Sequence, residues 1–342
     1  MKKKLAFYGI MLLLGLGMAS FGYGQDKPAL PPHMPLNMEQ LQAALSSVRG
    51  PATSDQGWPR SIRYNYETHD YQTDTFREEL KTFTLPRQPT RIIPHAVGVA
   101  EILWAICPPE KLIAFNNYVV DPEFCVIAPA VKQQGKLIFT DQQTEVVLGA
   151  QPDLVITVFY SAAEFEAKLA QANIPFFDVG FFGDIASIKR QTLLLGQVIG
   201  EEGNAQALVA VIDQKMQELR NAIKKTEPPK RVLYYDAGGY IPGKFSNFNS
   251  MCEMIGVVNV GAEQGIKTWA QIDYETLLKW NPDVIITPQE SQLQQELLAN
   301  KLLSYARAIR TKQVYPIPGL YLRITSQYMI LSANVLAGIV YR

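Results

Sequence analysis

The segment T-E-V-V-L-G-A-Q-P-D-L-V-I-T at residues 144–157 returns as Y-E-T-L-L-K-W-N-P-D-V-I-I-T at residues 274–287, at a constant offset of 130 positions. Each copy has an acidic residue at the start of a short helical stretch, then Pro-Asp, then an apolar run of strand length. Proline stops a helix, and a short apolar run bounded by turn residues is typical of a strand buried in a parallel sheet. The repeat therefore predicts two similar α/β lobes.

Short apolar strands alternate with helical stretches on both sides of the repeat. Strand-like runs lie at 91–93, before a Pro-His turn, and at 111–115 and 174–179 in the first half, and at 231–235 and 313–317 in the second. Helices are expected within about 293–308, and a C-terminal helix from about 326 onward. Strands and helices that alternate in this way favour a mostly parallel sheet covered on both faces. We predict an α/β protein with two α/β sandwich lobes, bridged by a single long helix, with a ligand cleft between the lobes.

The bridging helix is predicted from an apolar pattern at helical spacing. The residues of this pattern are Leu208, Val211, Ile212, Met216, Leu219 and Ile223. A helix from about 202 to 225 would be ~35 Å long, which is enough to connect two lobes. The predicted organisation is a signal peptide at 1–24, a leader with edge strands at 25–85, an N-terminal lobe at 86–200, a linking helix at 201–228 and a C-terminal lobe at 229–342.

The N-terminus has the pattern of a secretory signal. Three lysines at 2–4 precede an apolar run at 5–18 and small residues up to Gly24, so a cut before Gln25 is expected. An uncleaved anchor is the alternative. No cysteine lies near the cut, so a bacterial lipoprotein anchor is not expected. The mature protein is predicted to be a soluble protein of the periplasm.

The leader from Gln25 to about Pro59 is rich in proline and polar residues, which predicts a flexible segment with a helical turn or two around 38–45. Loosely alternating aromatic and polar residues at 61–85 predict one or two edge strands before the first lobe.

Composition narrows the classes of partner and of chemistry. The 32 basic and 32 acidic side chains cancel, so nucleic acid is an unexpected partner. Three cysteines, Cys107, Cys125 and Cys252, allow at most one disulfide, and buried free thiols are the alternative. No zinc spacing, nucleophile elbow or phosphate-binding glycine pattern is present. No catalytic residue and no metal site are assigned.

Glu145 and Glu275 occupy equivalent places in the repeat. Acidic residues in a first helical turn are common because they suit the helix dipole. Two of them on equivalent surfaces of two lobes also suit docking to a two-fold partner through exposed ion pairs. Both interpretations stay open from the residues alone.

The chain from about 86 to 342 resembles the bacterial periplasmic binding proteins that serve ABC importers of ferric siderophores, haem and cobalamin. The resemblance is carried by P-T-R-I-I at 89–93, E-I-L at 101–103, the repeat itself, G-E-E-G-N-A at 200–205, G-V-V-N at 256–259 and W-A-Q-I-D-Y-E-T-L-L at 269–278. It implies two lobes joined by one long helix, with the ligand in a shallow cleft between them. The leader up to about 85 is longer than the resemblance explains.

The resemblance also implies roles for particular residues. Glu145 and Glu275 match the two glutamates that dock to arginines of the permease dimer. Phe139 and Trp269, six residues before each glutamate, match pocket aromatics. Further ligand-binding candidates at strand ends are His95, Tyr118, Phe159, Tyr160, Tyr240, Tyr321 and Arg323. Aromatic faces suit a flat macrocycle, tyrosinate can ligate ferric haem, and arginine pairs with an anionic chelate.

The function implied is that of a solute-binding component of an ABC importer, which captures an iron chelate, haem or a corrinoid and delivers it to the permease and its ATPase. No intrinsic cofactor is expected, and a monomer is expected. The alternatives are an exported enzyme that uses the cleft, and a signalling or metal-carrier module. The sequence does not name the ligand.

Overall fold

The two copies of the repeat have the same local backbone structure. In the computed structural model, which describes residues 30–50, 57–70, 75–224 and 226–342, each copy is a short helix followed by a strand. Gln151 and Asn281, which precede the two prolines, both have a left-handed backbone, with φ of 49° and 47°. The paired elements are α5 (Thr144–Gly149) with β6 (Leu154–Thr157) and α11 (Tyr274–Trp280) with β12 (Val284–Pro288).

The repeated aspartate explains why Pro-Asp occurs twice. The Asp153 carboxylate accepts a hydrogen bond from the backbone N–H of Arg91 at 2.8 Å, and the Asp283 carboxylate accepts one from the N–H of Arg231 at 2.8 Å. Each arginine in turn donates to carbonyl oxygens at the end of its repeat helix, Arg91 to Ala150 and Arg231 to Trp280. The aspartates thus tie the first strand of each lobe to the repeat.

The N-terminal lobe is built on parallel strands. β3 (Ile92–Pro94), β6 and β7 (Phe176–Asp178) form one sheet in the order β3-β6-β7, and β4 (Ala114–Asn116) pairs with β5 (Leu137–Phe139). A parallel bridge between Ile92 and Leu112 connects the two sheets. The helical segments of this lobe are α3 (Val97–Ile106), η1 (Pro109–Lys111), η2 (Asn117–Val120), α4 (Ala128–Gln133), α5 and α6 (Ala163–Gln171).

The C-terminal lobe repeats the plan with an added hairpin-like pair. Its parallel sheet has the order β10-β8-β12-β13, and β9 pairs antiparallel with β11. The strands are β8 (Arg231–Tyr234), β9 (Tyr240–Pro242), β10 (Val258–Asn259), β11 (Trp269–Gln271) and β13 (Val314–Ile317). The helical segments are η3 (Ala237–Gly239), α9 (Asn247–Ile255), α10 (Val260–Glu263), α11, α12 (Leu293–Ala299), η4 (Lys301–Leu303), α13 (Arg307–Arg310), α14 (Gly319–Arg323) and α15 (Met329–Val340). The mostly parallel α/β class predicted from the sequence is confirmed.

The helices predicted over about 293–308 are three short helical segments. α12 ends before Asn300, whose side-chain oxygen accepts a hydrogen bond from the backbone N–H of Leu302 at 3.0 Å. This local bond offers the backbone an alternative to a continuing helix. The chain therefore breaks into α12, η4 and α13.

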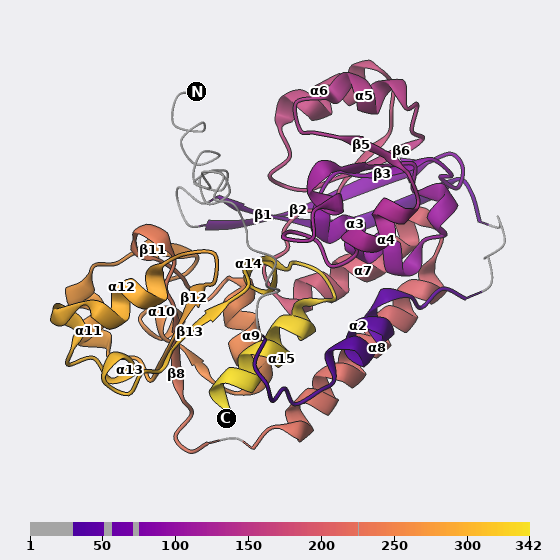
Figure 1. Cartoon of the computed structure of the whole chain (residues 1–342). Helices are drawn as coiled ribbons and strands as arrows, with labels where there is room; N and C mark the ends of the chain where they lie inside the picture. The colour runs from indigo at the N-terminus through magenta and orange to yellow at the C-terminus, as the bar shows by residue number, and fades with distance from the viewer. Residues whose placement is uncertain (1–29, 51–56, 71–74, 225) are drawn as a thin grey trace.

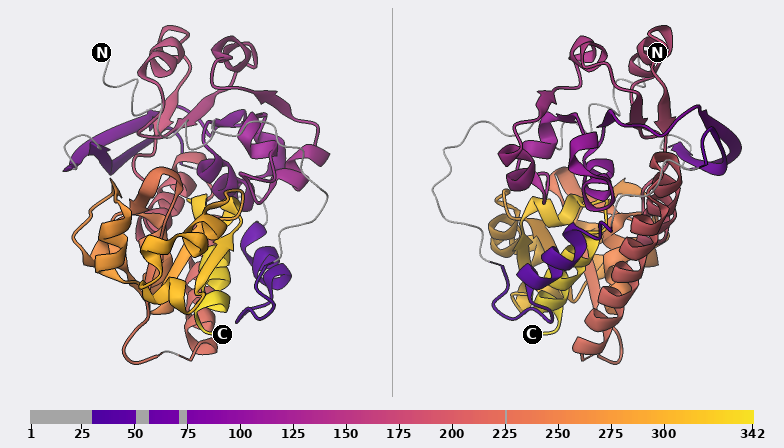
Figure 2. Two further views of the ribbon diagram at one scale, coloured as in Figure 1. Left: turned by 60° about the vertical axis from the view of Figure 1, so that its left-hand side comes forward. Right: turned by 90° about the vertical axis from the view of Figure 1, so that its right-hand side faces the viewer.

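The predicted bridging helix is α8 (Glu202–Ala222), and it follows α7 (Ile185–Ile199) after a turn at Gly200, which has a φ of 77°. α7 packs against α8. The 21 residues of α8 span ~30 Å, and Figure 2 shows α8 running along one side of both lobes. The lobe limits 86–200 and 229–342, with the linker at 201–228, remain a proposal.

The leader is ordered where the structure describes it, which corrects the expectation of a flexible segment over residues 30–50. α2 (Met38–Ser46) buries Leu41 and Leu45 and lies beside α8 (Figure 1). Asn334 of α15 accepts from the N–H of Leu36 and donates to its carbonyl oxygen, both at 2.9 Å. The predicted signal peptide at 1–24 lies outside the described residues.

The edge strands expected at 61–85 instead form a separate antiparallel hairpin of β1 (Arg60–Asp70) and β2 (Thr75–Leu85). It joins neither lobe's sheet. Its contacts are made by side chains and loops instead: Phe181 donates its N–H to the Glu67 carbonyl oxygen at 2.9 Å, and Phe76 packs on Phe245 of the C-terminal lobe. The hairpin thus touches both lobes.

One apolar core runs through both lobes. It includes buried residues of α3, α8, α9 and α15, while each repeat helix packs in a smaller cluster of its own lobe, around Val147 in the first and Leu277 in the second. The three cysteines are free and buried, and burial raises the pKa of the Cys107 thiol to about 12. Within the described ranges, no helix has the length and apolar character that crossing a membrane requires.

Candidate ligand-binding site

Polar side chains gather where strands of the N-terminal lobe end. His95 follows β3, Asn116 ends β4 and Asp141 follows β5. The Asn116 amide donates to Asp141 Oδ1 at 2.6 Å, and His95 Nε2 lies 3.9 Å from the same oxygen. The carboxyl ends of parallel strands are where open α/β sheets bind ligands, so this cluster is a candidate wall of the site.

His95 lies at the edge of an aromatic cluster. Its ring stacks on Phe165 at 4.4 Å and on Phe139 at 6.1 Å, and its side chain is 12% exposed. Burial lowers the pKa of the imidazole, although the Asp141 carboxylate opposes this effect. A neutral imidazole follows near pH 7. Ser161 Oγ lies 3.4 Å from its Nδ1.

Phe139 has no face open to a ligand in this conformation, because it is 1% exposed and packs in the apolar cluster behind His95. We correct the expectation that it lines the pocket directly. Its spacing from Glu145 matches that of Trp269 from Glu275, but Phe139 is buried at the end of β5, whereas Trp269 is partly exposed at the start of β11. The sequence repeat does not predict that Phe139 is buried while Trp269 is partly exposed.

A second aromatic group crosses from one lobe to the other. Phe159, after β6, packs on Tyr160 at 5.2 Å and on Phe181 at 5.5 Å. Phe181 contacts Phe76 of the hairpin at 5.1 Å, and Phe76 contacts Phe245 of the C-terminal lobe at 4.6 Å. The sequence analysis predicted Phe159 and Tyr160 as site residues, and Phe76 of the hairpin links Phe181 to Phe245.

The C-terminal lobe presents Trp269 beside a buried tyrosine. The Trp269 ring meets Tyr234 edge to face at 6.0 Å, and Tyr234 donates its hydroxyl hydrogen to Asp236 at 2.7 Å. Burial raises the pKa of Tyr234, and the Asp236 carboxylate adds to this effect. Tyr240 is half-buried in β9, the strand that pairs with the strand of Trp269. Tyr234 and Asp236 were not predicted as site residues.

Arg323 bridges the lobes through an aromatic ring. Its guanidinium lies over Phe124 at 5.4 Å, and Phe124 contacts Tyr118 at 5.1 Å. Two predicted residues, Tyr118 and Arg323, therefore contact the same ring. Tyr321, two residues before Arg323, is half-buried, and burial raises the pKa of its phenol, which disfavours a tyrosinate ligand there.

Glu145 and Glu275 are both exposed in the first turns of α5 and α11. Asp273, not Glu275, caps α11 by accepting from the N–H of Thr276 at 2.8 Å. Neither glutamate has a hydrogen bond or an ion pair with another described residue. Both carboxylates are therefore available to a partner.

A buried carboxylate, missed by the sequence-based search, lies between the lobes. Glu101 of α3 is 1% exposed and accepts from the hydroxyl of Ser326 in the C-terminal lobe at 2.5 Å and from the N–H of Val126 at 2.8 Å. Its position inside the apolar stretch V-G-V-A-E-I-L-W-A-I at 97–106 is the signal that could have revealed it. Burial raises its pKa to about 7.

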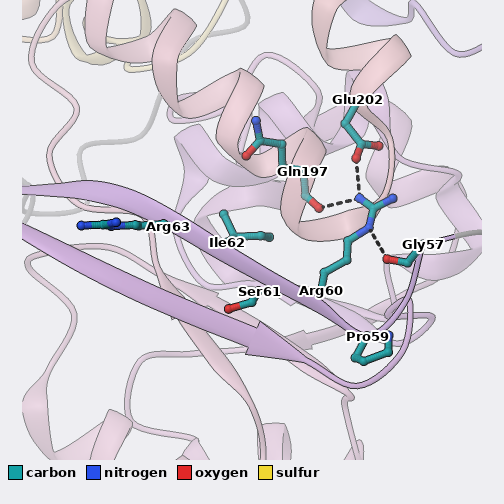
Figure 3. Close-up of a pocket in the computed structure, with 8 residues that line it drawn as sticks. All are labelled: Gly57, Pro59, Arg60, Ser61, Ile62, Arg63, Gln197 and Glu202. Carbon is teal, nitrogen blue, oxygen red and sulfur yellow. Dashed lines mark hydrogen bonds and ion pairs between the residues drawn. The ribbon is translucent and has the colours of Figure 1, made fainter.

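Two surface hollows lie apart from all these residues. One, of about 390 Å³, is lined by the start of the hairpin, and Arg60 points across it to Glu202 and the Gln197 carbonyl oxygen (Figure 3). The other, of about 500 Å³, surrounds the bonds between Arg91 and Asp153. In each hollow an arginine is already bound to an acidic residue of the same lining, Arg60 to Glu202 and Arg91 to Asp153. In the part of the chain that the structure describes, no group of three His, Cys, Asp or Glu residues could hold a metal ion.

The sequence matches a known protein family. The family described as "Periplasmic binding protein" matches residues 98–320. The chain belongs to this family. A cobalamin-binding protein of Halobacterium salinarum is 21% identical over 68% of this chain, and the ferric-anguibactin-binding protein FatB of Vibrio anguillarum is 23% identical over 54% of it. The matched regions span 62% and 61% of those two proteins.

Solved structures share the fold. The periplasmic haem-binding protein HutB of Vibrio cholerae has a TM-score of 0.63 at 17% identity, and the match covers 74% of this chain and 99% of that protein. Likeness at this identity establishes the architecture of the family, two α/β lobes, and leaves the ligand of this chain open.

Proposed function

We propose that this periplasmic binding protein is the solute-binding component of an ABC importer. It captures an iron–siderophore, haem or cobalamin-type ligand between its lobes and delivers it to the permease dimer and its ATPase. The observation that carries the proposal is the pair of exposed, unpaired glutamates, Glu145 and Glu275, at equivalent places in two repeated lobes. Two matching carboxylates suit a two-fold partner that presents cations.

The ligand would lie between the strand ends of the two lobes. On the N-terminal side we propose His95, Tyr118, Phe159 and Tyr160, and on the C-terminal side Tyr240, Trp269, Tyr321 and Arg323. Aromatic faces from both sides suit a large flat ligand. Phe139 would support His95 from behind. We infer an exported protein that acts in the periplasm as a monomer and does no covalent chemistry.

Ligand titration tests the binding half of the proposal. The protein is titrated with haem, cobalamin, ferric siderophores and molybdate, and binding is followed by ligand absorbance as well as by tryptophan fluorescence. We expect saturable binding of one of the first three, weakened by Trp269→Ala. The control is Trp58→Ala, since the Trp58 ring lies against the Arg60 guanidinium at the start of the hairpin, outside the proposed site. Silence across the panel would refute the proposal.

Uptake measurements test the docking half. In Glu145→Gln/Glu275→Gln, uptake should fall to background while ligand affinity is retained. The matched control is Glu78→Gln/Glu296→Gln, which changes two other exposed glutamates, on β2 and α12. Equal uptake by the two double variants would exclude the proposed docking role.

A further inference from the structure

The two most exposed large apolar side chains of the described residues lie three positions apart. Tyr305 is 84% exposed and Leu302 is 72% exposed. Both lie in the segment that contains η4 and α13. Single exposed apolar residues are common on soluble proteins, but two large neighbours at such exposure point to a contact surface.

The same segment is basic. Lys301, Arg310 and Lys312 are exposed, and none of them has an ion pair with another described residue. Arg307 is paired with Asp283 at 2.6 Å. From residue 297 to the C-terminus the sequence contains no aspartate or glutamate, and the nearest acidic residue before it is Glu296. We call Lys301, Leu302, Tyr305, Arg310 and Lys312 the basic apolar patch.

The patch lies next to the helix that carries Glu275. η4 packs against α11, and the N–H of Arg307 donates to Asn281 Oδ1 at 2.7 Å at the end of that helix. Seven residues at 1.5 Å each make α11 about 10 Å long, so Glu275 at its start is close to the patch. Figure 1 shows α11, α12 and α13 together at one end of the C-terminal lobe.

We propose that the basic apolar patch binds the surface of a membrane that contains anionic lipids. Unpaired cations attract anionic headgroups, and a leucine and a tyrosine insert at the boundary between headgroups and acyl chains. The full chain has a net charge of zero, and residues 25–342 carry 29 basic and 32 acidic side chains, so the attraction is local to this segment. A specific protein interface uses roughly 20–30 residues on each side, far more than the five residues here.

This inference does not depend on the identity of the ligand. The membrane contact complements the proposed function. A protein held at the membrane surface by this patch would keep the adjacent Glu275 near the outer face of a transporter in the same membrane. Ligand binding and vesicle binding are measured separately, so either can fail alone.

Vesicle sedimentation tests the proposal with the form of the protein recovered from the periplasm. We expect binding to phosphatidylcholine vesicles that contain about one third phosphatidylglycerol, weakening as salt is raised, and much less binding to pure phosphatidylcholine. Lys301→Gln/Arg310→Gln/Lys312→Gln should lower the partition coefficient about a hundredfold, at about fivefold for each cation. The control Arg63→Gln/Arg87→Gln/Lys132→Gln removes three cations elsewhere and should bind as the unchanged protein does.

A local probe tests whether the patch itself meets the lipid. Because the three native cysteines are buried, Tyr305→Cys can be labelled selectively with an environment-sensitive fluorophore. We expect a blue shift with anionic vesicles, and none for Leu137→Cys, whose parent side chain is 44% exposed on the other lobe. Absent or charge-independent vesicle binding, or equal binding by the patch and control variants, would overturn the proposal. Lost uptake without vesicle binding would assign the patch to a protein partner instead.

Discussion

Replacing Glu101 with glutamine should make the protein more stable at pH 8 and leave it nearly unchanged at pH 4.5. Glu101 is buried between the lobes, and burial raises the pKa of its carboxyl from 4.5 to about 7, against the effect of hydrogen bonds from Ser326, Val126 and Cys125. The folded protein therefore holds this proton more tightly than the unfolded chain does. The stability contributed by the proton is fully present below pH 4.5 and is lost as the pH rises towards 7.

The size of the effect follows from the two pKa values. Each tenfold difference in proton affinity is worth about 1.4 kcal/mol, so the change from 4.5 to about 7 amounts to roughly 3 kcal/mol. Glutamine has the same shape and does not titrate, and it can accept from the Val126 N–H while donating to the Ser326 hydroxyl. The neighbouring Cys125 and Tyr328 stay protonated, because burial raises the pKa of both groups.

Urea denaturation at pH 4.5, 6, 7 and 8 measures the effect. The difference in free energy of unfolding between Glu101→Gln and the unchanged protein should grow with pH and level off above 7. The comparison removes the contributions of other titrating groups, including Glu166 and Asp178. Glu101→Ala is the control for lost packing and should destabilise by roughly 2–4 kcal/mol at pH 4.5. Because alanine does not titrate either, this loss should shrink by roughly 3 kcal/mol as the pH rises to 8. If Glu101→Gln were the less stable protein at pH 8, our reasoning would be refuted. The hydrogen-bond donors would then offset the free-energy cost of burying the ionised carboxylate.

Three further substitutions test the packing of α2, the contact between Gly98 and Thr325, and the bonds of Asp283. Leu45→Ala should cost roughly 2–4 kcal/mol of unfolding free energy in urea, because Leu45 is fully buried under α2; a loss below about 0.5 kcal/mol would mean that α2 is not part of the core. Gly98→Ala would place a methyl 2.7 Å from Thr325 Oγ1 and 2.8 Å from its carbonyl oxygen, so we expect a loss of about 1–3 kcal/mol, and an unchanged melting temperature would contradict the close packing. Asp283→Asn should cost roughly 1–2 kcal/mol by weakening the bonds from Arg231 and Arg307. Asp213→Asn, which changes a more exposed aspartate, should cost less in the same assay.

Much of the fold could be predicted because its signals are local. Pro-Asp stops a helix and starts a strand wherever it occurs, and the 3.6-residue period of Leu208, Ile212 and Leu219 marks a buried helix face from sequence alone. The break at Asn300 is also local, but it depends on one side-chain hydrogen bond that composition does not reveal.

The candidate site was less predictable, because exposure is not a property of residue type. Phe139 and Trp269 have the same spacing to their glutamates, yet Phe139 is buried and Trp269 is partly exposed. Tyr234 contacts Trp269 although the two residues belong to strands of separate sheets, β8 and β11. The sequence predicted where the strands end, but it did not predict which side chains at those ends are exposed to a ligand.

By itself the sequence determined two repeated α/β lobes, a long helix between them and a matched pair of acidic residues, since helix stops, strand runs and periodicity act over a few neighbouring residues. Only the tertiary structure decided that the leader packs as α2 and that the hairpin touches both lobes. It alone brought Glu101 against Ser326, 225 positions away. Contacts at such separation depend on the packing of whole elements, because burying apolar surface outweighs the chain entropy lost in bringing distant segments together.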